Sequence, residues 1–266
     1  MTLRRAYADT PLGQLHYAED GAGRTVLMLH QAPRSLDEFA EVQCELSTDV
    51  HTIATDLLGF GMSPPLAAPQ TIEAMADGVI ALLDALEVEA PVLLGHHTGA
   101  AVALEVAAQA PERVDALVLS SMPWVGPARR ASGKSVGVDD AQQRNDGSHL
   151  TELWSLRQPY YPADRPDLLD RFIRDALAPG VDPAEGHRAC DRYVMDERIG
   201  LVQCPVLVLT ATDDPFAAPA LPHIVHGLTG AAQVTTASVD GAMIPAMEQC
   251  ADQVAKHVRS FLAQLP

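Results

Sequence analysis

A titratable side chain stands between two glycines at residues 95–99, which read Gly-His-His-Thr-Gly. An apolar run ends just before this segment and a helical pattern starts just after it, so His97 falls at a sharp strand-to-helix turn. Glycines suit such a turn because it leaves room only for small neighbours. Imidazole has an unperturbed pKa of ~6.5 and serves as general base, general acid or hydrogen-bond donor. The spacing therefore predicts proton-transfer chemistry at His97.

Apolar runs without polar alternation predict the strands that position this turn, because such runs are typical of parallel strands buried on both faces. These runs are residues 26–30, 52–55, 91–95, 116–120, 206–211 and 232–238. Helical patterns occur at residues 35–46, 71–86, 98–110 and 247–265. We expect an α/β fold with three layers, a mostly parallel sheet and right-handed crossovers. An antiparallel pair at residues 4–8 and 14–18 precedes it.

The sequence changes character after Ser121. Residues 126–147 are rich in Gly, Ser, Arg, Asp and Gln and show little periodicity. Short amphipathic segments then follow at residues 149–157, 165–178 and 184–197. We therefore predict a core made of residues 1–122 and 200–266, with a helical lid of residues 123–199 inserted between two strands of the sheet.

Five motifs, in chain order, resemble those of the α/β-hydrolase superfamily. Residues 27–33 (Leu-Met-Leu-His-Gln-Ala-Pro) resemble its oxyanion loop, and residues 95–99 resemble its nucleophile elbow. Residues 56–63, 111–114 and 204–210 match other segments of the same superfamily. The resemblance covers nearly the whole chain and implies a three-layer α/β-hydrolase fold that carries a helical lid.

The departures from the family pattern concern the catalytic residues. The family normally has Ser, sometimes Cys or Asp, where this chain has His97. The family's acid follows the seventh strand, which is where Asp214 stands, with adjacent Asp213 as the alternative. Met243 occupies the place of the general-base His. A Ser-His-Asp acyl-enzyme mechanism therefore cannot be assembled from the expected positions.

The resemblance also implies what surrounds His97. The backbone N–H groups of Ala32 and Thr98 would form an oxyanion hole that polarises a carbonyl. Because Met243 leaves the base's place free, the long His97 side chain is expected to approach Asp214, directly or through water. The structural alternatives are that His97 merely fills space and that Asp214, followed by Pro, forms an ordinary turn.

Five residues are predicted to line the substrate pocket: His30, Gln31, Arg34, Trp124 and Met243. His30 is ordinarily structural in this motif, whereas Gln31 replaces the usual Gly and could place an amide at the pocket rim. Arg34 could bind a substrate carboxylate or be solvated on its loop. Trp124 belongs to a set of lid aromatics that either wall an apolar pocket or pack the lid against the core.

Charge and composition exclude several partners. The 266 residues include 18 Lys and Arg against 35 Asp and Glu, a formal net charge of −17 that repels nucleic acid and anionic membrane surfaces. The four cysteines form no C-x-x-C pair, and no P-loop, G-x-G-x-x-G or H-E-x-x-H spacing occurs, so we expect no metal and no cofactor. Without a signal-like N-terminus or an apolar run of ~20 residues, a cytoplasmic protein is expected. Its partner is expected to be a small-molecule substrate, and a homodimer is left open.

Two functions are compatible with this sequence. The first is an α/β-hydrolase-family enzyme, of hydrolase or lyase/isomerase type, that acts on a small hydrophobic carbonyl or ester-type substrate by cofactor-free acid/base chemistry at His97. The second is a non-catalytic ligand- or partner-binding protein that kept the pocket and lost the triad. The sequence does not decide between the two, nor between the reaction types.

Overall fold

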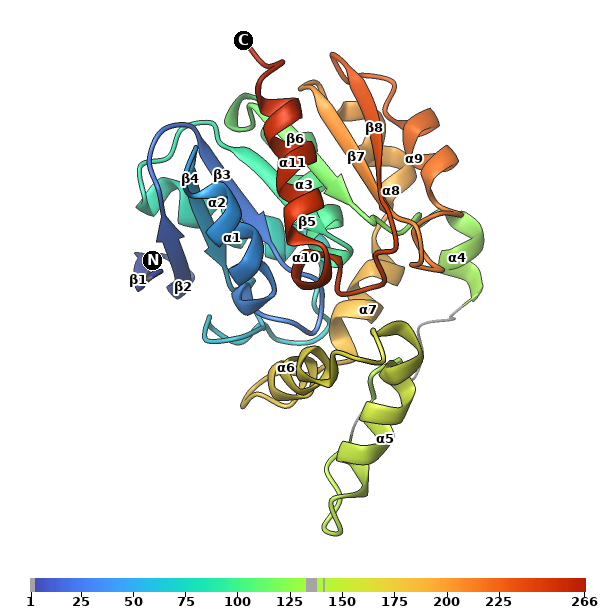
Figure 1. Ribbon diagram of the computed structural model, residues 1–266. Helices are drawn as coiled ribbons and strands as arrows, with labels where there is room; N and C mark the ends of the chain where they lie inside the picture. Colours follow the sequence, from blue (N-terminus) through green and yellow to red (C-terminus); the bar gives the residue numbers. More distant parts are fainter. Residues whose placement is uncertain (1–2, 133–137, 141) are drawn as a thin grey trace.

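The computed structural model describes residues 3–132, 138–140 and 142–266, and in this part of the chain eight strands form one sheet (Figure 1). The strand order is β1-β2-β4-β3-β5-β6-β7-β8. β2 pairs antiparallel with β1 and β4, and the other neighbours pair in parallel. The strands are Arg4–Thr10 (β1), Gly13–Asp20 (β2), Thr25–Leu29 (β3), His51–Thr55 (β4), Val92–His96 (β5), Ala116–Ser120 (β6), Val206–Ala211 (β7) and Val234–Val239 (β8). The predicted mostly parallel sheet is confirmed.

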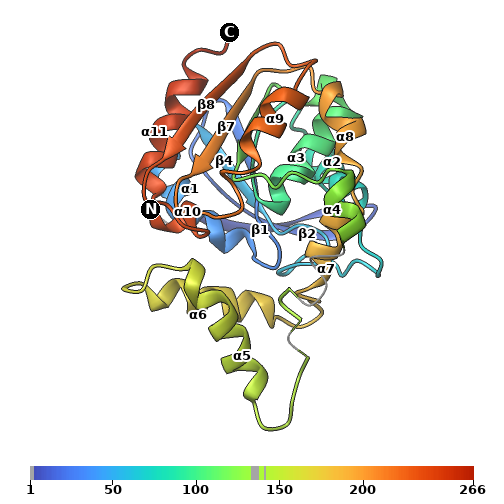
Figure 2. The ribbon, with the colours of Figure 1, turned by 90° about the vertical axis from the view of Figure 1, so that its right-hand side faces the viewer.

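Helices cover both faces of this sheet, which gives the three predicted layers (Figure 2). One face carries α1 (Ala40–Leu46) and α11 (Ala251–Leu262), and the other carries α2 (Ile72–Ala85) and α3 (Thr98–Gln109). α9 (Leu221–Gly227) packs with the second group. Within the described ranges, four short 3-10 turns complete the core and the connections: η1 (Leu36–Phe39), η2 (Pro111–Arg113), η3 (Gln158–Tyr160) and η4 (Ile199–Leu201).

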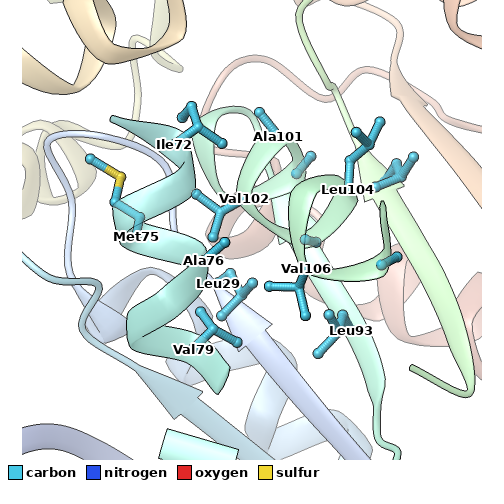
Figure 3. Close-up of a cluster of buried hydrophobic side chains, with 14 of the residues drawn as sticks. Leu29, Ile72, Met75, Ala76, Val79, Leu93, Ala101, Val102, Leu104 and Val106 are labelled. Atoms are coloured by element: carbon cyan, nitrogen blue, oxygen red, sulfur yellow. The ribbon is translucent and has the colours of Figure 1, made fainter. Parts of the chain in front are cut away.

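The strand that leads to His97 is buried on both faces. On one face, Leu93 of β5 shares a fully buried cluster with Met75 of α2 and Val102 of α3 (Figure 3). Leu94 belongs to the cluster under α1 and α11, because successive strand side chains point to opposite faces. β5 is therefore fixed from both sides, and so is the turn at its end.

Two predicted helices are each divided in two. Residues 247–265 form α10 (Ala246–Gln249) and α11, with a non-helical Cys250 between them. Residues 184–197 form α7 (Glu185–Arg192) and α8 (Met195–Arg198), separated by Tyr193 in extended conformation. The hydroxyl of buried Tyr193 donates to Glu105 Oε2 at 2.8 Å, so a contact with α3 overrides the local helical pattern.

The connection between β6 and β7 contains α4 (Pro127–Ser132), α5 (Ser148–Arg157), α6 (Pro166–Ala176), α7 and α8. α5 and α6 lie apart from the three layers, whereas α7 and α8 run beside α3 (Figures 1 and 2). We call residues 123–199 the lid segment; within it, residues 133–137 and 141 lie outside the described part. In the described ranges no helix has the length and apolar character needed to cross a membrane.

Ion pairs fasten α6 to the core. Arg171 Nε lies 2.7 Å from Asp37 Oδ2, and its Nη1 lies 2.6 Å from Glu41 Oε1. Asp175 Oδ2 lies 3.0 Å from the Nε of Arg34, which follows β3. Each pair joins residues more than 100 positions apart in the sequence, so the position of α6 depends on charges that local patterns do not reveal.

Candidate active site

The turn between β5 and α3 holds His97 in a strained backbone conformation, with φ 46° and ψ −111°. A Cβ atom on Gly95 would lie 2.3 Å from Gly99 O, and one on Gly99 would lie 1.9 Å from Leu29 O. Both positions thus require glycine, because neighbouring backbone atoms leave no room for a Cβ atom. Such a conformation costs about 1–3 kcal/mol and persists only where the surrounding packing fixes it.

The structure brings His97 and Asp214 together. His97 Nε2 lies 2.8 Å from Asp214 Oδ2, although the pair lacks the direction of a hydrogen bond. Asp214 is 1% exposed, and its Oδ1 accepts a hydrogen bond of 2.8 Å from Phe216 N. Burial raises the pKa of Asp214, but the adjacent His97 ring and the Phe216 amide outweigh it and hold this pKa below its ordinary value. Asp214 is therefore charged at neutral pH, while Asp213 is exposed to solvent.

His96 supports the neighbouring His97 ring from within the core. Its Nε2 donates to Ile244 O at 2.9 Å, and its Nδ1 accepts from Ser120 Oγ at 3.1 Å. Full burial and the nearby His97 lower the pKa of His96 to about 3, so this ring is neutral. The two rings meet edge to face with centroids 4.6 Å apart, a favourable aromatic geometry.

A cavity of about 280 Å³ opens beside His97. Its described lining residues come from both the core and the lid segment: Gln31, Ala32, His97, Thr98, Pro123, Arg129, Val138, Arg157, His187, Cys190, Phe216 and Ile244. No described residue accepts a hydrogen bond from the backbone N–H of Ala32 or Thr98. Both residues line the cavity, as the predicted oxyanion hole requires.

Gln31 is the one predicted pocket residue that lies in the described wall of the cavity. Its backbone N–H and its side-chain amide both donate to Glu38, which fixes the orientation of the side chain. His30 lies behind it rather than in the wall, a correction to the prediction. The Nδ1 of His30 donates to Gln31 O at 2.8 Å and its Nε2 accepts from Leu57 N at 3.0 Å. Both ring nitrogens are thus used inside the core.

The prediction that Trp124 and Met243 line the pocket is also corrected, because neither lies in the described cavity wall. The Trp124 ring stacks on His223, with centroids 5.4 Å apart and an angle of 17° between the planes. Met243 is half-buried and its backbone N–H donates to Gln249 Oε1 at 2.8 Å, so the next residue, Ile244, lines the cavity instead.

The prediction that Arg34 lines the pocket needs the largest correction. Its side chain is fully buried and reaches neither solvent nor the described cavity wall. Its Nε donates to Asp175 Oδ2 at 3.0 Å and its Nη1 donates to Glu248 Oε1. Burial and the charge of Glu248 raise the pKa of nearby Glu38 to about 8, and burial also raises the pKa of Glu248. Arg34 therefore binds the lid segment to the core and is not available to a substrate.

Helix α7 places lid side chains directly over the predicted oxyanion hole. Gly186 packs on Ala32 so closely that a Cβ atom would lie 2.2 Å from Ala32 Cβ. One turn further on, Cys190 Sγ lies 3.6 Å from Thr98 Oγ1. His187 stands between these two contacts and lines the cavity.

Buried Asp139 connects two of the lid side chains that face the cavity. Its Oδ2 lies 2.7 Å from His187 Nε2, and its Oδ1 accepts from Arg157 Nε at 2.6 Å. The Arg157 guanidinium also lies over the Phe172 ring, 4.9 Å from its centroid. Burial lowers the pKa of His187 despite the adjacent Asp139 carboxylate, so its ring is neutral at neutral pH.

Sequence reasoning missed Arg157, His187 and Asp139. The signal that could have found His187 is Gly186, because a glycine inside a helical pattern often marks close backbone packing. Arg157 and Asp139 gave no comparable local signal, since their pairing joins residues 18 positions apart across an irregular segment. In the described ranges no group of three or more His, Cys, Asp or Glu is placed to hold a metal ion.

Replacing Gly186 by Ala is expected to destabilise the protein by about 1–3 kcal/mol, because the new methyl group collides with Ala32 across the interface between lid segment and core. Urea unfolding measures this loss. The matched control is Gly200→Ala in η4, which should cost less because the nearest atom to its new Cβ is Thr229 Oγ1 at 3.1 Å. Equal stability of the Gly186 variant and the wild type would show that α7 does not press on Ala32.

The chain belongs to the α/β-hydrolase fold family, whose model matches residues 24–179. It is 34% identical over 148 residues, 55% of this chain, to the dihydrolipoyllysine-residue acetyltransferase component of the acetoin cleaving system of Cupriavidus necator, covering 39% of that protein. It is 37% identical over 105 residues, 38% of this chain, to the 2-hydroxymuconate semialdehyde hydrolase of Pseudomonas sp. strain CF600, covering 37% of that protein. These matches thus span less than half of each relative's length.

The fold is also that of solved hydrolase structures. E-2-(acetamidomethylene)succinate hydrolase superposes with a TM-score of 0.81 at 20% identity, covering 98% of this chain and all of that one. The enol-lactonase of Burkholderia xenovorans LB400 gives 0.76 at 22% identity, covering 97% of this chain and all of that one. At this identity the likeness shows the fold alone.

Proposed function

We propose that this chain is an α/β-hydrolase-family enzyme that acts on a small, largely hydrophobic carbonyl or ester-type substrate by cofactor-free acid/base chemistry centred on His97. The observation that carries this proposal is the 2.8 Å contact between His97 and the buried, charged Asp214 at the cavity. The small volume and the apolar Val138, Phe216 and Ile244 favour a small substrate. A relative described as a semialdehyde hydrolase supports an enzyme.

In this proposal Asp214 sets the protonation of the His97 ring. A carboxylate only accepts hydrogen bonds, so Asp214 favours the form of His97 that carries its proton on Nε2. Nδ1 then holds the lone pair, and it has no described partner. His97 can thus act as a general base through Nδ1.

The lone pair on His97 can receive a proton from either of two sources. If water gives up the proton, its oxygen attacks the carbonyl carbon, and the proton later passes to the leaving group: a hydrolysis. If the carbon next to the carbonyl gives up the proton, an enolate forms and the proton returns to carbon or to a leaving group, as in an isomerase or lyase. In both cases charge develops on the carbonyl oxygen, where the N–H groups of Ala32 and Thr98 would stabilise it.

Nucleophilic catalysis by a hydroxyl or thiol has less support. No serine belongs to the described cavity wall, and its hydroxyl and thiol side chains are Thr98 and Cys190. Burial raises the pKa of the Cys190 thiol, which keeps it protonated and poorly nucleophilic.

Fluorophosphonate probes, which trap activated serines, are expected not to label this protein stoichiometrically. Ser120 Oγ contacts His96, Ser63 Oγ donates to Asp56 O at 2.7 Å, and neither has a free imidazole base beside it. Intact-protein mass spectrometry measures the labelling. A full single adduct on one serine would place the active site elsewhere.

One observation favours the second candidate function, a ligand-binding protein without catalysis. Met243 stands where the family has its base, and the contact between His97 and Asp214 lacks hydrogen-bond direction. A binder should gain thermal stability from a ligand by mass action and leave that ligand unchanged. Slow, saturable conversion of a stabilising ligand would exclude this candidate.

The proposal is tested with a panel of small esters, lactones, β-dicarbonyls and epoxides. Product formation and thermal stabilisation are measured on the same compounds with wild type and with His97→Ala. We expect conversion of at least one stabilising compound, and loss of that conversion in the variant. Conversion that persists in His97→Ala would remove His97 from the mechanism.

A further inference from the structure

Among the described residues, the lid side of the cavity presents cationic groups and no acid. Its charged residues are Arg129 and Arg157, and none of the described lining residues is Asp or Glu. This is unexpected in a chain with 35 acidic and 18 basic residues. Each of these arginines is paired with an aspartate, Arg157 with Asp139 and Arg129 with Asp191.

Arg157 is a fixed guanidinium with one free end. Its side chain is 10% exposed and its Nε and Nη2 atoms both donate to the Asp139 carboxylate. Packing over Phe172 holds the plane of the group. A guanidinium has five N–H donors, and the two on Nη1 have no described acceptor. These two donors are therefore available to a ligand in the cavity.

Arg129 is held in the same way. Its Nε donates to Asp191 Oδ1 at 2.9 Å, and no described residue accepts from its Nη1 or Nη2. In both arginines an aspartate fixes the Nε side, so the terminal nitrogens remain for a second acceptor. Burial lowers the pKa of Arg157, but Asp139 more than offsets this, so the group stays charged.

We propose that Arg157 and Arg129 bind a carboxylate group of the substrate, which makes the substrate a small carbonyl compound that also carries a carboxylate. This inference rests on the proposed function, since it places the reacting carbonyl at His97 and the carboxylate at the opposite, lid side of the same cavity. A planar carboxylate matches the N–H donors of guanidinium groups in direction and spacing. The net charge of −17 repels anions at long range, so short-range donors of this kind are needed to hold one.

The test compares 4-oxopentanoate with 4-oxopentanamide, a pair that differs in charge and hardly in size. Dissociation constants come from NMR titration. We expect wild type to bind the acid at least about tenfold more tightly than the amide, as a charge-assisted hydrogen-bonded pair implies. Equal affinity for the two compounds would overturn the inference. Displacement of the acid by equimolar inorganic phosphate would also overturn it, because the site would then bind anions in general.

Arg157→Gln is expected to abolish the preference for the acid and to leave binding of the amide unchanged. The matched control is Arg144→Gln, an exposed lid arginine paired with Glu152, which should retain the preference. If Arg157→Gln fails to fold because Asp139 loses its partner, Arg129→Gln serves instead, since its side chain is 31% exposed. A preference that survives in the folded variant would overturn the inference.

His97→Gln separates this inference from the proposed function. The variant should lose turnover and keep the preference for the acid, because the carboxylate lies away from His97. Loss of preference in Arg157→Gln with turnover unaffected by His97→Gln would refute the proposed function alone. If turnover is lost in His97→Gln but the wild type shows no preference for the acid, the carboxylate site alone is refuted.

Discussion

Replacing His97 by Gln is expected to lower turnover by about 10²–10⁴-fold on any compound that the wild type converts, the usual contribution of a general acid/base residue. Glutamine has a similar size and keeps a hydrogen-bonding end, but it cannot hold a proton at neutral pH. The loss should therefore appear in kcat more than in KM. Steady-state kinetics on the best substrate of the panel measure both.

The acid beside His97 gives this expectation a second readout. Asp214 has a pKa below its ordinary value, because the His97 ring and the Phe216 amide favour its charged form despite burial. A base mechanism then predicts that Asp214→Asn weakens catalysis, because the variant lacks the charge beside the His97 ring. The control is His149→Gln, a half-buried residue of the lid segment outside the described cavity wall. Turnover equal to wild type in the His97 variant would contradict the mechanism.

Replacing Arg34 by Ala is expected to destabilise the protein by about 3–5 kcal/mol, because it removes the fully buried cation from an ionic cluster. Asp175 and Glu248 would each lose a direct partner, and the fully buried Glu38 would lose a nearby positive charge. Urea unfolding at neutral pH measures the effect. An exposed pair, Arg165 with Asp167, provides the control: Arg165→Ala should cost about 0–1 kcal/mol.

The pH dependence of stability follows from the same cluster. The pKa of Glu38 rises from 4.5 to about 8 on folding, so its contribution to stability is present below pH 4.5 and is lost as pH rises toward 8. Without Arg34 the remaining carboxyl groups favour their protonated form more strongly. The loss of stability caused by Arg34→Ala should therefore be smaller in acid. A loss of stability in the variant that becomes larger in acid would contradict this account of the cluster.

Much of the fold could be predicted because its signals are local. β6 and β7 coincide with the predicted residues 116–120 and 206–211, since strands buried on both faces read as unbroken apolar runs. Boundaries failed where a distant contact decided the backbone. Tyr193 ends α7 early because its hydroxyl bonds Glu105, which is 88 positions away.

The core half of the candidate site was likewise accessible from the sequence, and the lid half was not. His97 and Asp214 follow strands of one parallel sheet, so topology alone brings them to the same edge. Arg34 was misplaced because its partners Asp175 and Glu248 are 141 and 214 positions away. Arg157 was overlooked because the sequence pattern of the lid helices does not predict which way their polar side chains face.

The strained turn at residue 97 has a consequence for how this chain could change its chemistry. Gly95 and Gly99 fix the backbone there through contacts that do not involve the side chain between them. Any residue placed at position 97 therefore projects from the same point, next to the same two amides and the same acid. A change of one residue at this position can therefore exchange the side chain while the backbone turn that holds it stays intact.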